Sequence, residues 1–415
     1  MRNRSIPEIR FSEFAGEWEQ CTLRSMVDRV KSYSLSRDVE TSEYTGYKYI
    51  HYGDIHTKVA DIIDEFSHLP NIKAGNYELL EKGDLVLADA SEDYQGIAAP
   101  AVVTIDVPYK LVSGLHTIAL RPKQVDSLFL YYLINSPIFR KYGYKTGTGM
   151  KVFGISATNL LKFENLFPLL EEQSKIGNFF KRLDDMIALH QQELITLKQT
   201  KQGFLQKMFP KEGESVPEVR FPGFTGEWME RELKEISILI TKGTTPADKS
   251  WEGTIKYIKT DSINLINGNI ENTSRISKEE HEGNLKRSKL EVNDILFSIV
   301  GTLGRVGIVK EKDLPANTNQ QICIIRLSEG DINFIFTALK THSIEKFIKS
   351  DATIGAQPSI SLWQMEALKV PYPQFEEQTQ IGNFFKQLDD TITLHQRELD
   401  ALKETKKAFL QKMFV

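Results

Sequence analysis

Three short patterns in this sequence contain residue types that perform chemistry elsewhere, and none of them forms a complete site. Asp106-Val-Pro-Tyr109 is close to the N/D-P-P-Y/F motif of amino-methyltransferases, but it lacks the first proline and a cofactor-binding glycine strand. Gly301-Thr-Leu-Gly304-Arg-Val-Gly307 spaces its glycines three apart, which matches neither G-x-G-x-x-G nor a P-loop, so we expect a turn between strands. Glu232-Leu-Lys234 resembles the end of a nuclease site without a partner aspartate.

Metal and cofactor sites are also not predicted. The eight histidines and two cysteines show no zinc-ligand spacing. Gly147-Thr-Gly149 has the composition of a flexible loop rather than a phosphate cradle. We therefore predict a non-catalytic chain with no metal ligands and no cofactor of its own.

Basic and aromatic residues occur together in polar, turn-rich stretches, which suits binding to nucleic acid. Lysines in such loops can contact phosphates, and Ser, Thr, Asn, Gln or Arg can contact base edges. The alternative is that these stretches are ordinary solvated loops. The DNA-binding candidates are Lys31, Tyr33, Lys48, Lys58, Lys242, Thr244, Thr245, Lys249, Arg275, Lys286 and Arg287.

The composition is that of a soluble globular protein long enough for two or more domains. A net charge of −4 argues against strong non-specific binding to nucleic acid by the chain alone. Only Cys21 and Cys323 are present, and the N-terminus lacks the apolar segment of a signal peptide. The apolar stretch Ser127–Phe139 is too short to span a bilayer. We expect a cytoplasmic protein.

An internal repeat must position these loops. Residues 171–209 (EEQSKIGNFFKRLDDMIALHQQELITLKQTKQGFLQKMF) and residues 376–414 (EEQTQIGNFFKQLDDTITLHQRELDALKETKKAFLQKMF) match at 28 of 39 positions. Residues 6–18 (IPEIRFSEFAGEW) recur as residues 216–228 (VPEVRFPGFTGEW). Such repeats dictate architecture. The chain therefore consists of two equivalent halves, each beginning with the same short module and ending with the same helix.

Each repeated helix carries apolar residues at the alternating four- and three-residue spacing of a coiled coil. The predicted interface is Ile176, Phe180, Leu183, Ile187, His190, Leu194, Leu197, Phe204 and Met208, with Ile381, Phe385, Leu388, Ile392, His395, Leu399, Leu402, Phe409 and Met413. The alternative is that each stripe packs separately on its own domain. A pseudo-twofold axis crossing the helices predicts antiparallel pairing, with Ile176 near Met413, Phe180 near Phe409 and Leu183 near Lys406.

Two kinds of polar residue interrupt the stripe. His190 and His395 could form a metal pair or a pH switch. We favour the alternative that they fix register, because no carboxylate or cysteine cluster with ligand spacing accompanies them in the sequence. Lys201 and Lys406 are expected to extend their ammonium groups to solvent.

Between the markers the halves diverge, but a common skeleton of short strands remains, for example Tyr47–Ile50 and Ile255–Ile258. We predict an α+β chain in which two similar mixed α/β domains are joined by a long antiparallel two-helix coiled coil, as a pseudo-twofold tandem repeat. The expected divisions are residues 1–168, the first domain with its module; 169–210, the first helix; 211–228, the linker and second module; 229–373, the second domain; and 374–415, the second helix.

The combination of both repeats resembles the specificity subunit of type I restriction–modification enzymes. Its most specific marks are Pro168–Gln173 (PLLEEQ) and Pro373–Gln378 (PQFEEQ), each leading into I-G-N-F-F-K-x-L-D-D. The resemblance implies two target recognition domains, each reading one half of a bipartite double-stranded DNA sequence. It also implies that the repeated helices dock two methyltransferase (modification) subunits, and that motor-nuclease (restriction) subunits join the full complex. S-adenosylmethionine, ATP and Mg²⁺ then belong to those partners.

Helix length agrees with such a bipartite target. A 39-residue helix is about 58 Å long at ~1.5 Å per residue, and one turn of DNA is ~34–36 Å. Two alternatives stay open from the residues alone: a scaffold that presents two ligand-binding domains without DNA, and a self-contained methyltransferase, which the incomplete motifs disfavour.

Overall fold

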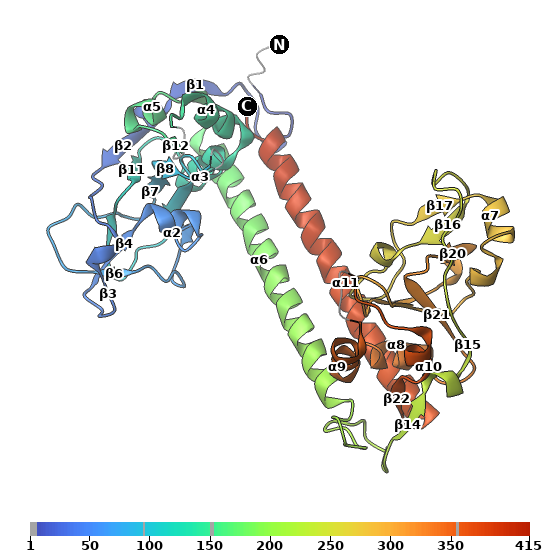
Figure 1. Cartoon of the computed structure of the whole chain (residues 1–415). Helices are drawn as coiled ribbons and strands as arrows, with labels where there is room; N and C mark the ends of the chain where they lie inside the picture. Colours follow the sequence, from blue (N-terminus) through green and yellow to red (C-terminus); the bar gives the residue numbers. More distant parts are fainter. Residues whose placement is uncertain (1–5, 94–95, 150–152, 354–356) are drawn as a thin grey trace. The chain divides into compact units, whose positions relative to one another are not determined.

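The computed structural model describes residues 6–93, 96–149, 153–353 and 357–415 (Figure 1). They form two compact units. The first contains the described residues up to Leu189 together with Leu399–Val415, and the second contains His190–Glu398. Both long helices, α6 (Leu170–Lys207) and α11 (Phe375–Lys412), contribute to both units.

The first domain, before α6, consists of short strands and five helices in its described part. Its elements are β1 (Glu19–Thr22), α1 (Leu23–Met26), β2 (Val27–Val30), β3 (Glu40–Thr41), β4 (Tyr47–Ile50), α2 (Tyr52–His56), β5 (Ile62–Ile63), β6 (Asn71–Ile72), β7 (Leu85–Ala88), β8 (Ala90–Ser91), β9 (Pro100–Val103), β10 (Lys110–Ser113), β11 (Thr117–Pro122), α3 (Ser127–Asn135), α4 (Pro137–Thr146), β12 (Phe153–Gly154), α5 (Ala157–Leu161) and β13 (Glu164–Phe167).

The second domain repeats this order with fewer small strands. Its elements are β14 (Met229–Glu232), β15 (Ser237–Lys242), β16 (Ile255–Ile258), β17 (Ser274–Ile276), α7 (Lys278–Glu282), β18 (Ile295–Ser298), β19 (Val306–Ile308), β20 (Ala316–Thr318), β21 (Ile322–Leu327), α8 (Ile332–Ala338), α9 (His342–Asp351), α10 (Leu362–Glu366) and β22 (Lys369–Tyr372).

Corresponding sheets in the two domains share one order of equivalent strands, and each of the two larger sheets of the first domain has one further strand at its edge. The main sheet is β2-β11-β7-β9-β5 in the first domain and β15-β21-β18-β19 in the second. A smaller sheet contains a parallel pair in each case, β4 with β10 and β16 with β20. A two-stranded antiparallel ladder, β1 with β13 or β14 with β22, closes each domain beside the start of its long helix. The mixed α/β repeat predicted from the sequence is confirmed.

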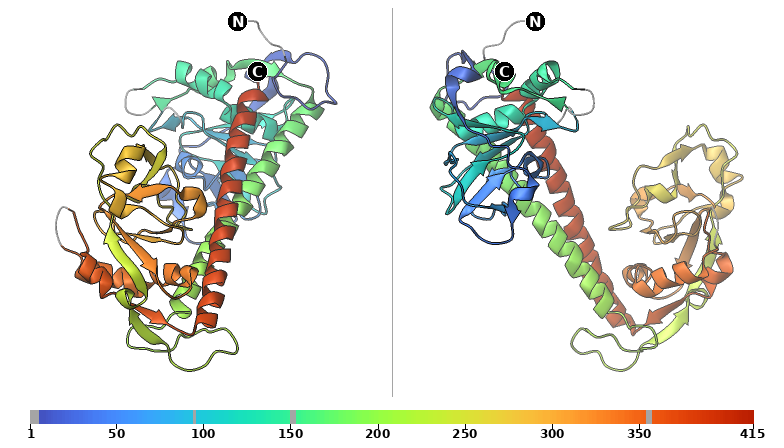
Figure 2. Two further views of the ribbon diagram at one scale, coloured as in Figure 1. Left: turned by 90° about the vertical axis from the view of Figure 1, so that its right-hand side faces the viewer. Right: turned by 60° about the vertical axis from the view of Figure 1, so that its left-hand side comes forward.

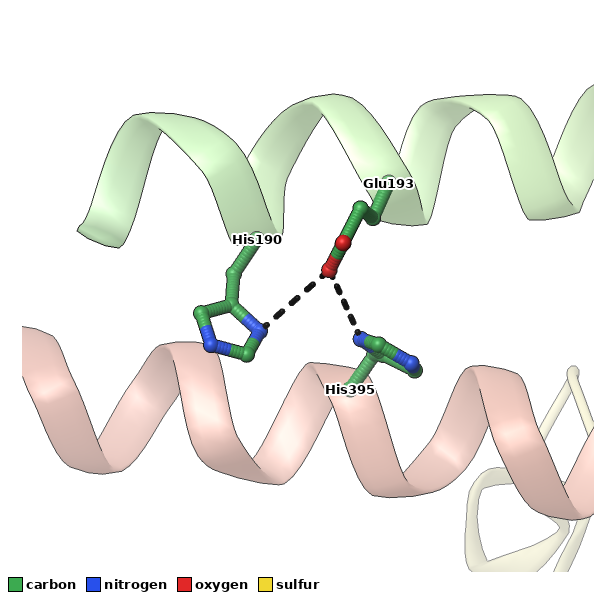
Figure 3. Close-up of side chains that lie close together, drawn as sticks. All are labelled: His190, Glu193 and His395. Carbon is green, nitrogen blue, oxygen red and sulfur yellow. Dashed lines mark ion pairs between the residues drawn. The ribbon is translucent and has the colours of Figure 1, made fainter. Parts of the chain in front are cut away.

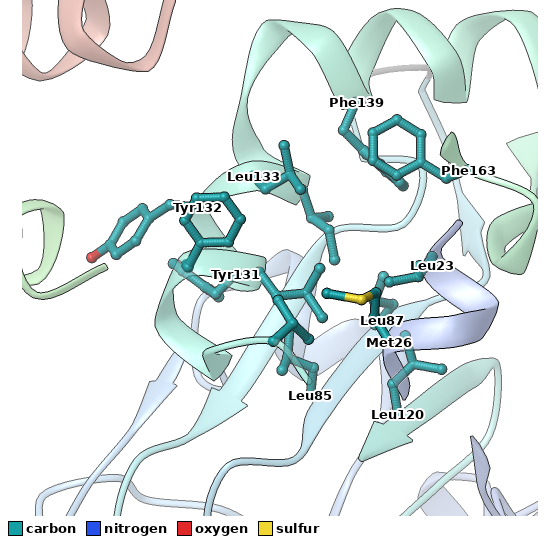
Figure 4. Packing of buried hydrophobic residues seen from close by; sticks show 14 of the residues in the cluster. Leu23, Met26, Leu85, Leu87, Leu120, Tyr131, Tyr132, Leu133, Phe139 and Phe163 are labelled. Carbon is teal, nitrogen blue, oxygen red and sulfur yellow. The ribbon is translucent and has the colours of Figure 1, made fainter. Parts of the chain in front are cut away.

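The core of the first domain lies between the main sheet and the helices that follow it. Figure 4 shows Leu85, Leu87 and Leu120 from the strands packed beneath α3, which contributes Tyr131 and Leu133. Leu85 and Leu87 both face this core, because successive side chains of a strand point to opposite sides of the sheet and every second residue shares a face. The corresponding cluster of the second domain is built around Phe297, Ile325, Phe334, Met365 and Phe385.

The start of each long helix packs against the end of the other. In the first unit, Ile176 shares a core cluster with Met413, and the rings of Phe179 and Phe409 lie 5.2 Å apart. In the second unit, Phe204 and Phe384 lie 5.1 Å apart. The helices run side by side in opposite directions in the three views of Figures 1 and 2. The predicted antiparallel pairing is confirmed.

One predicted contact of that register is wrong. Phe180 does not meet Phe409 but stacks on Phe414, at 5.8 Å, and contacts Tyr132 of the first domain at 5.1 Å. The reason is that this turn of α6 also covers the core of its own domain, so Phe180 turns toward α3 and leaves its neighbour Phe179 to meet Phe409. At this end of α6 the apolar stripe therefore packs both against α11 and against the domain that precedes it, which are the two alternatives that the sequence left open.

The expectation that two lysines of the stripe reach solvent is also wrong. Lys201 of α6 pairs with Asp389 of α11 in the second unit, and Lys406 of α11 pairs with Asp184 of α6 in the first. Asp389 is buried, which raises the pKa of its carboxyl group. The sequence could not reveal these pairs because each partner is on the other helix.

The repeated residues at the start of each long helix make the same contacts in both units. The second glutamate of each E-E-Q, Glu172 or Glu377, is almost fully buried and forms a two-pronged ion pair with the module arginine, Arg10 or Arg220. The glutamine, for example Gln378, accepts a hydrogen bond from the backbone before α8. These contacts attach module, helix and domain to one another.

The glycine of each I-G-N-F-F segment permits this attachment. A Cβ atom on Gly382 would lie 2.5 Å from Oδ1 of Asp331 and 2.7 Å from the backbone nitrogen of Phe334. Asp331 caps α8 by accepting a hydrogen bond from that nitrogen. Gly177 has the same role at the start of α3. The repeated glycines are therefore required where two helices meet closely.

Lys340, just after α8, is the most perturbed lysine among the described residues whose pKa is shifted. Its ammonium group donates hydrogen bonds to the carbonyls of Leu265 (3.2 Å) and Ile266 (2.7 Å) and lies 4.6 Å from the ring centre of Phe336. Burial lowers the pKa of Lys340 to about 7. Folding therefore favours its neutral form.

This shift predicts a pH dependence of stability. Between about pH 7 and about pH 10 the unfolded chain holds a proton at Lys340 that the folded chain has released. The free energy of unfolding consequently rises with pH in this window, by at most about 1.4 kcal/mol per pH unit from this group. We expect the free energy of unfolding of Lys340→Met to exceed that of the wild type most near pH 7. The difference between the two free energies should shrink toward pH 10. Urea unfolding of both chains across this range measures it, and a difference independent of pH would contradict the assignment.

No helix in the described ranges combines the length and the apolar character that a membrane span requires.

Candidate nucleic-acid interface

The polar loops that follow the parallel strand pair form an equivalent site in each domain. In the first domain, β4 leads into His51-Tyr52 and β10 into Leu115-His116. In the second, β16 leads into Lys259-Thr260-Asp261 and β20 into Asn319–Gln321. Because the carboxyl ends of parallel strands meet at one edge of a sheet, each pair of loops lies together. His116 and Gln321 both stand three residues beyond their strands.

Aromatic and imidazole rings dominate the site of the first domain. The ring of Tyr52 lies 5.3 Å from that of His116, 4.5 Å from that of His51 and 6.0 Å from that of His56. His116 is half exposed, and its Nδ1 lies 3.1 Å from a carboxylate oxygen of Asp89. The exposed ring of His116 and the partly exposed ring of Tyr52 thus offer ring faces, which suit stacking or contact with a thymine methyl group, and the His116 imidazole can bind a base edge.

A layer of charged residues fixes this site from beneath. Asp54 accepts a hydrogen bond from the backbone nitrogen of His51 (3.0 Å) and pairs with Arg37 at 2.8 Å. Arg37 also binds Glu40, which accepts a hydrogen bond from Tyr49. Burial lowers the pKa of His51, so its imidazole is neutral near pH 7 and its Nδ1 accepts the hydrogen bond from the backbone nitrogen of Gly53. The start of α2 is therefore held in place beside the exposed ring of His116.

The corresponding site of the second domain is a small polar hollow of ≈ 290 Å³. Its lining residues offer donors and acceptors of every kind: Lys259, Thr260, Asp261, Thr302, Arg305, Asn319 and Gln321. Lys259 lies over the ring of Trp251, with its nitrogen 3.6 Å from the ring centre. This cation–π contact holds the lysine at the rim of the hollow.

Two polar atoms at this hollow have no partner. Nε of Arg305 and the hydroxyl of Thr260 are buried without a hydrogen bond, although Nη1 of Arg305 donates to the carbonyl of Thr260 at 3.2 Å. A buried polar group without a partner costs free energy and calls for a ligand or water. The Nε of Arg305 can thus donate a hydrogen bond to a further group, and the hydroxyl of Thr260 can donate or accept one.

The predicted DNA-binding residues of the first domain are spread over its surface. Lys31 is exposed, with its ammonium 5.0 Å from the ring centre of Tyr33, whose hydroxyl accepts a hydrogen bond from the backbone of Glu78. Lys58 is exposed and pairs with Asp61 at 3.0 Å. Lys48 turns inward: it donates to the carbonyl of Leu69, and burial lowers its pKa. Lys48 is therefore a structural contact rather than an available cation.

Those of the second domain lie mostly on exposed loops. Arg287 donates to the hydroxyl of Thr244 at 3.2 Å, and Arg275 donates to a neighbouring carbonyl at the same distance. Thr245 is exposed. Three exposed lysines have no side-chain hydrogen bond or ion pair within the described ranges: Lys242, Lys249 and Lys286. None of the predicted candidates lines the hollow of the second domain or belongs to the ring cluster of the first domain, so their roles stay predictions.

None of the residues at the strand ends is among the DNA-binding candidates predicted from the sequence. One signal could have found them. The repeated strands Tyr47–Ile50 and Ile255–Ile258 align the two halves. The residues that directly follow them occupy equivalent positions in the alignment but differ in type. The second loop, which contains His116 or Gln321, has no such sequence marker. It comes to lie beside the first loop only because the two strands that precede the loops pair in parallel.

The weak catalytic patterns have structural roles. Glu232 and Lys234 pair with each other at 2.5 Å beside β14. Gly301 and Gly304 have positive φ angles in the turn between β18 and β19, as expected. Asp106–Tyr109 forms the connection between β9 and β10.

The predicted coiled-coil residues all lie in protected positions. None of the eighteen is exposed, whereas Leu189, Ile195 and Leu394, on other faces of the helices, are about half exposed or more.

A larger hollow of ≈ 850 Å³ lies where the first module, the first domain and the start of α6 meet. Charged residues of both signs line it, among them Glu13, Lys82 and Lys175.

Comparison with known proteins gives one family. The model of the type I restriction modification DNA specificity domain matches residues 15–199 and again residues 225–404. The type I restriction enzyme MjaVIII specificity subunit of Methanocaldococcus jannaschii is 25% identical over 313 residues, which is 72% of each chain. The putative MjaX specificity subunit of the same organism is 21% identical over 430 residues, 99% of this chain and 95% of the relative. A crystal structure of the type I restriction–modification S subunit from M. genitalium superimposes with a TM-score of 0.66 at 18% identity, covering 99% of both chains.

Proposed function

Since this chain belongs to the family of type I restriction modification DNA specificity domains and is a specificity subunit, we propose that its two domains read the two halves of a bipartite DNA target through the loops at their parallel strand ends. One observation carries the proposal. The same frame presents different side chains at the same place, rings around Tyr52 in one domain and the hollow around Arg305 in the other.

The long helices set the distance between the half-sites in this proposal. Each domain packs on its own stretch of the paired helices, so the length of the helices is the quantity that this proposal links to the spacer. The hollow beside the start of α6, which is lined by residues of both charges, suits docking of a modification subunit. We assign two modification subunits and the motor-nuclease subunits as partners.

The chemistry falls to those partners. Transfer of a methyl group from S-adenosylmethionine, and DNA translocation with ATP and Mg²⁺, require sites that we place outside this chain, which acts without catalysis of its own. The net charge of −4 supports a division in which the partners neutralise much of the phosphate backbone.

A reciprocal pair of substitutions tests the reading sites. His116→Ala and Gln321→Ala remove equivalent side chains from the two domains, so each serves as the control for the other. Loss of a good base contact costs about 1–3 kcal/mol, or roughly 5- to 150-fold in discrimination. We expect His116→Ala to relax one half-site and Gln321→Ala only the other, measured as methylation rates of the assembled methyltransferase on a set of single-base variants of its target. Weakening of both halves by either substitution would contradict the assignment.

A further inference from the structure

His190, Glu193 and His395 lie together between the long helices, in the second unit. Figure 3 shows the Glu193 carboxylate between the two imidazole rings. Its Oε2 lies 3.8 Å from Nδ1 of His190 and 3.4 Å from Nδ1 of His395. The ligand atoms of the three side chains are all within 4.8 Å of one another. The sequence-based expectation that no carboxylate accompanies these histidines is therefore wrong.

Both imidazole nitrogens that face Glu193 are buried and have no hydrogen-bond partner in the described structure. The two contacts to the carboxylate are too long for good hydrogen bonds. The rings are only 5.7 Å apart, and neither nitrogen is turned away to solvent. One partner bound between them would satisfy both nitrogens and the carboxylate oxygen on which they converge.

The spacing suits a tetrahedral metal ion. With Zn–N bonds of ~2.0–2.1 Å and Zn–O bonds of ~2.0–2.2 Å, the ligand atoms of a tetrahedral site are about 3.3–3.5 Å apart. The two nitrogen–oxygen distances, 3.4 and 3.8 Å, are at or within a few tenths of an ångström of this value, and the two imidazole nitrogens, which lie within 4.8 Å of each other, approach it by rotation of the side chains. Imidazole and carboxylate ligands select borderline divalent ions such as Zn²⁺, Co²⁺, Ni²⁺ or Cu²⁺.

Helix geometry explains why the ligands are held in place. His190 and Glu193 are three residues apart on α6, where side chains i and i+3 share a face. His395 comes from α11, at the position in the second repeat that corresponds to His190 in the first. A second carboxylate, Glu398, lies 3.9 Å from Nδ1 of His190 and can complete the coordination.

We propose that His190, Glu193 and His395 bind one borderline divalent transition-metal ion, which joins α6 to α11. The ion fixes the antiparallel register more firmly than polar residues in an apolar stripe do alone. Because metal binding to the folded chain adds to its stability, the helix pair becomes more resistant to unfolding when the ion is bound.

The test is titration of the full chain with Co²⁺ alone and with Zn²⁺ alone. We expect one equivalent of Co²⁺ to bind with the intense visible absorption of tetrahedral Co²⁺, without the sulfur charge-transfer band that binding at a cysteine would give. Zn²⁺ should displace it and raise the melting temperature.

Two variants distinguish ligation from helix stability. Glu193→Gln changes a half-exposed side chain and leaves the apolar stripe intact, and His395→Leu places an apolar residue in it. Both should weaken metal binding at least tenfold, the lower end of the effect of losing even an outer partner of a metal ligand, while the metal-free chain stays folded by circular dichroism.

A matched control is available on α9. His342 and Glu345 have the same i, i+3 spacing, at 3.5 Å, but are well exposed and belong to no group of three possible ligands among the described residues. His342→Ala should therefore leave Co²⁺ binding unchanged. Absence of stoichiometric binding by the wild-type chain, or unchanged affinity in both Glu193→Gln and His395→Leu, would overturn the proposal.

Discussion

Insertion of one heptad into each long helix is expected to lengthen the spacer of the methylated DNA target by about three base pairs and to leave both half-sites unchanged. Seven residues extend a helix by about 10.5 Å at ~1.5 Å per residue, and base pairs are stacked ~3.4 Å apart. Modification of the original target should be lost, because its half-sites no longer meet both domains.

The positions of the insertions follow from the helix pairing. One heptad, a copy of residues 184–190, is placed after His190, and the other, a copy of residues 395–401, is placed before His395. The inserts then face each other, and the a/d spacing continues through both junctions.

Two controls accompany this experiment. The same seven residues in the exposed segment 211–214 should leave the target unchanged, since that segment lies outside the paired helices. A heptad in only one helix should abolish methylation, because the two helices then lose their register. An unaltered spacer in the doubly extended chain would mean that the helices do not set the distance.

Replacement of Arg220 by methionine is expected to be the most destabilising of the substitutions considered. Nε and Nη2 of Arg220 bind the two oxygens of Glu377 at 2.6 and 2.7 Å. The Glu377 side chain is 0% exposed. Removal of the guanidinium leaves a buried carboxylate without its partner, which typically costs about 3–5 kcal/mol.

The double variant Arg220→Met/Glu377→Met separates this effect from lost packing. Without any buried charge it should recover most of the stability. Lys369→Met, which removes one partner of the exposed pair with Glu230, should have little effect. Urea unfolding measures all three. A single variant as stable as the wild type would show that the ion pair does not hold the module to the helix, and the corresponding Arg10→Met should agree in the first unit.

The sequence predicts much of this architecture because the repeats and the heptad are periodic patterns, which can be recognised without knowing the tertiary contacts. Ile176, Leu183 and their counterparts were placed correctly on a buried stripe, and the antiparallel direction followed from the tandem arrangement. The partners of Lys201 and Lys406 could not be predicted in this way, because the facing aspartates are set by the register between helices distant in sequence.

The reading sites were harder to predict for a related reason. His116 and Gln321 stand in unremarkable stretches and acquire a role only because parallel strand pairing brings their loops beside Tyr52 or Arg305. Composition pointed instead to lysines such as Lys48, which the fold turns inward. The contact between Glu193 and two histidines was missed because one imidazole comes from each helix.

The most direct measurement of the central claim is single-molecule sequencing of all methylated adenines in a host that carries this chain and its modification subunits. The proposal predicts one asymmetric motif in two parts, separated by a spacer of unspecified bases, with a modified adenine in each part. A single continuous motif, or methylation that requires only one of the two parts, would contradict the assignment of one half-site to each domain.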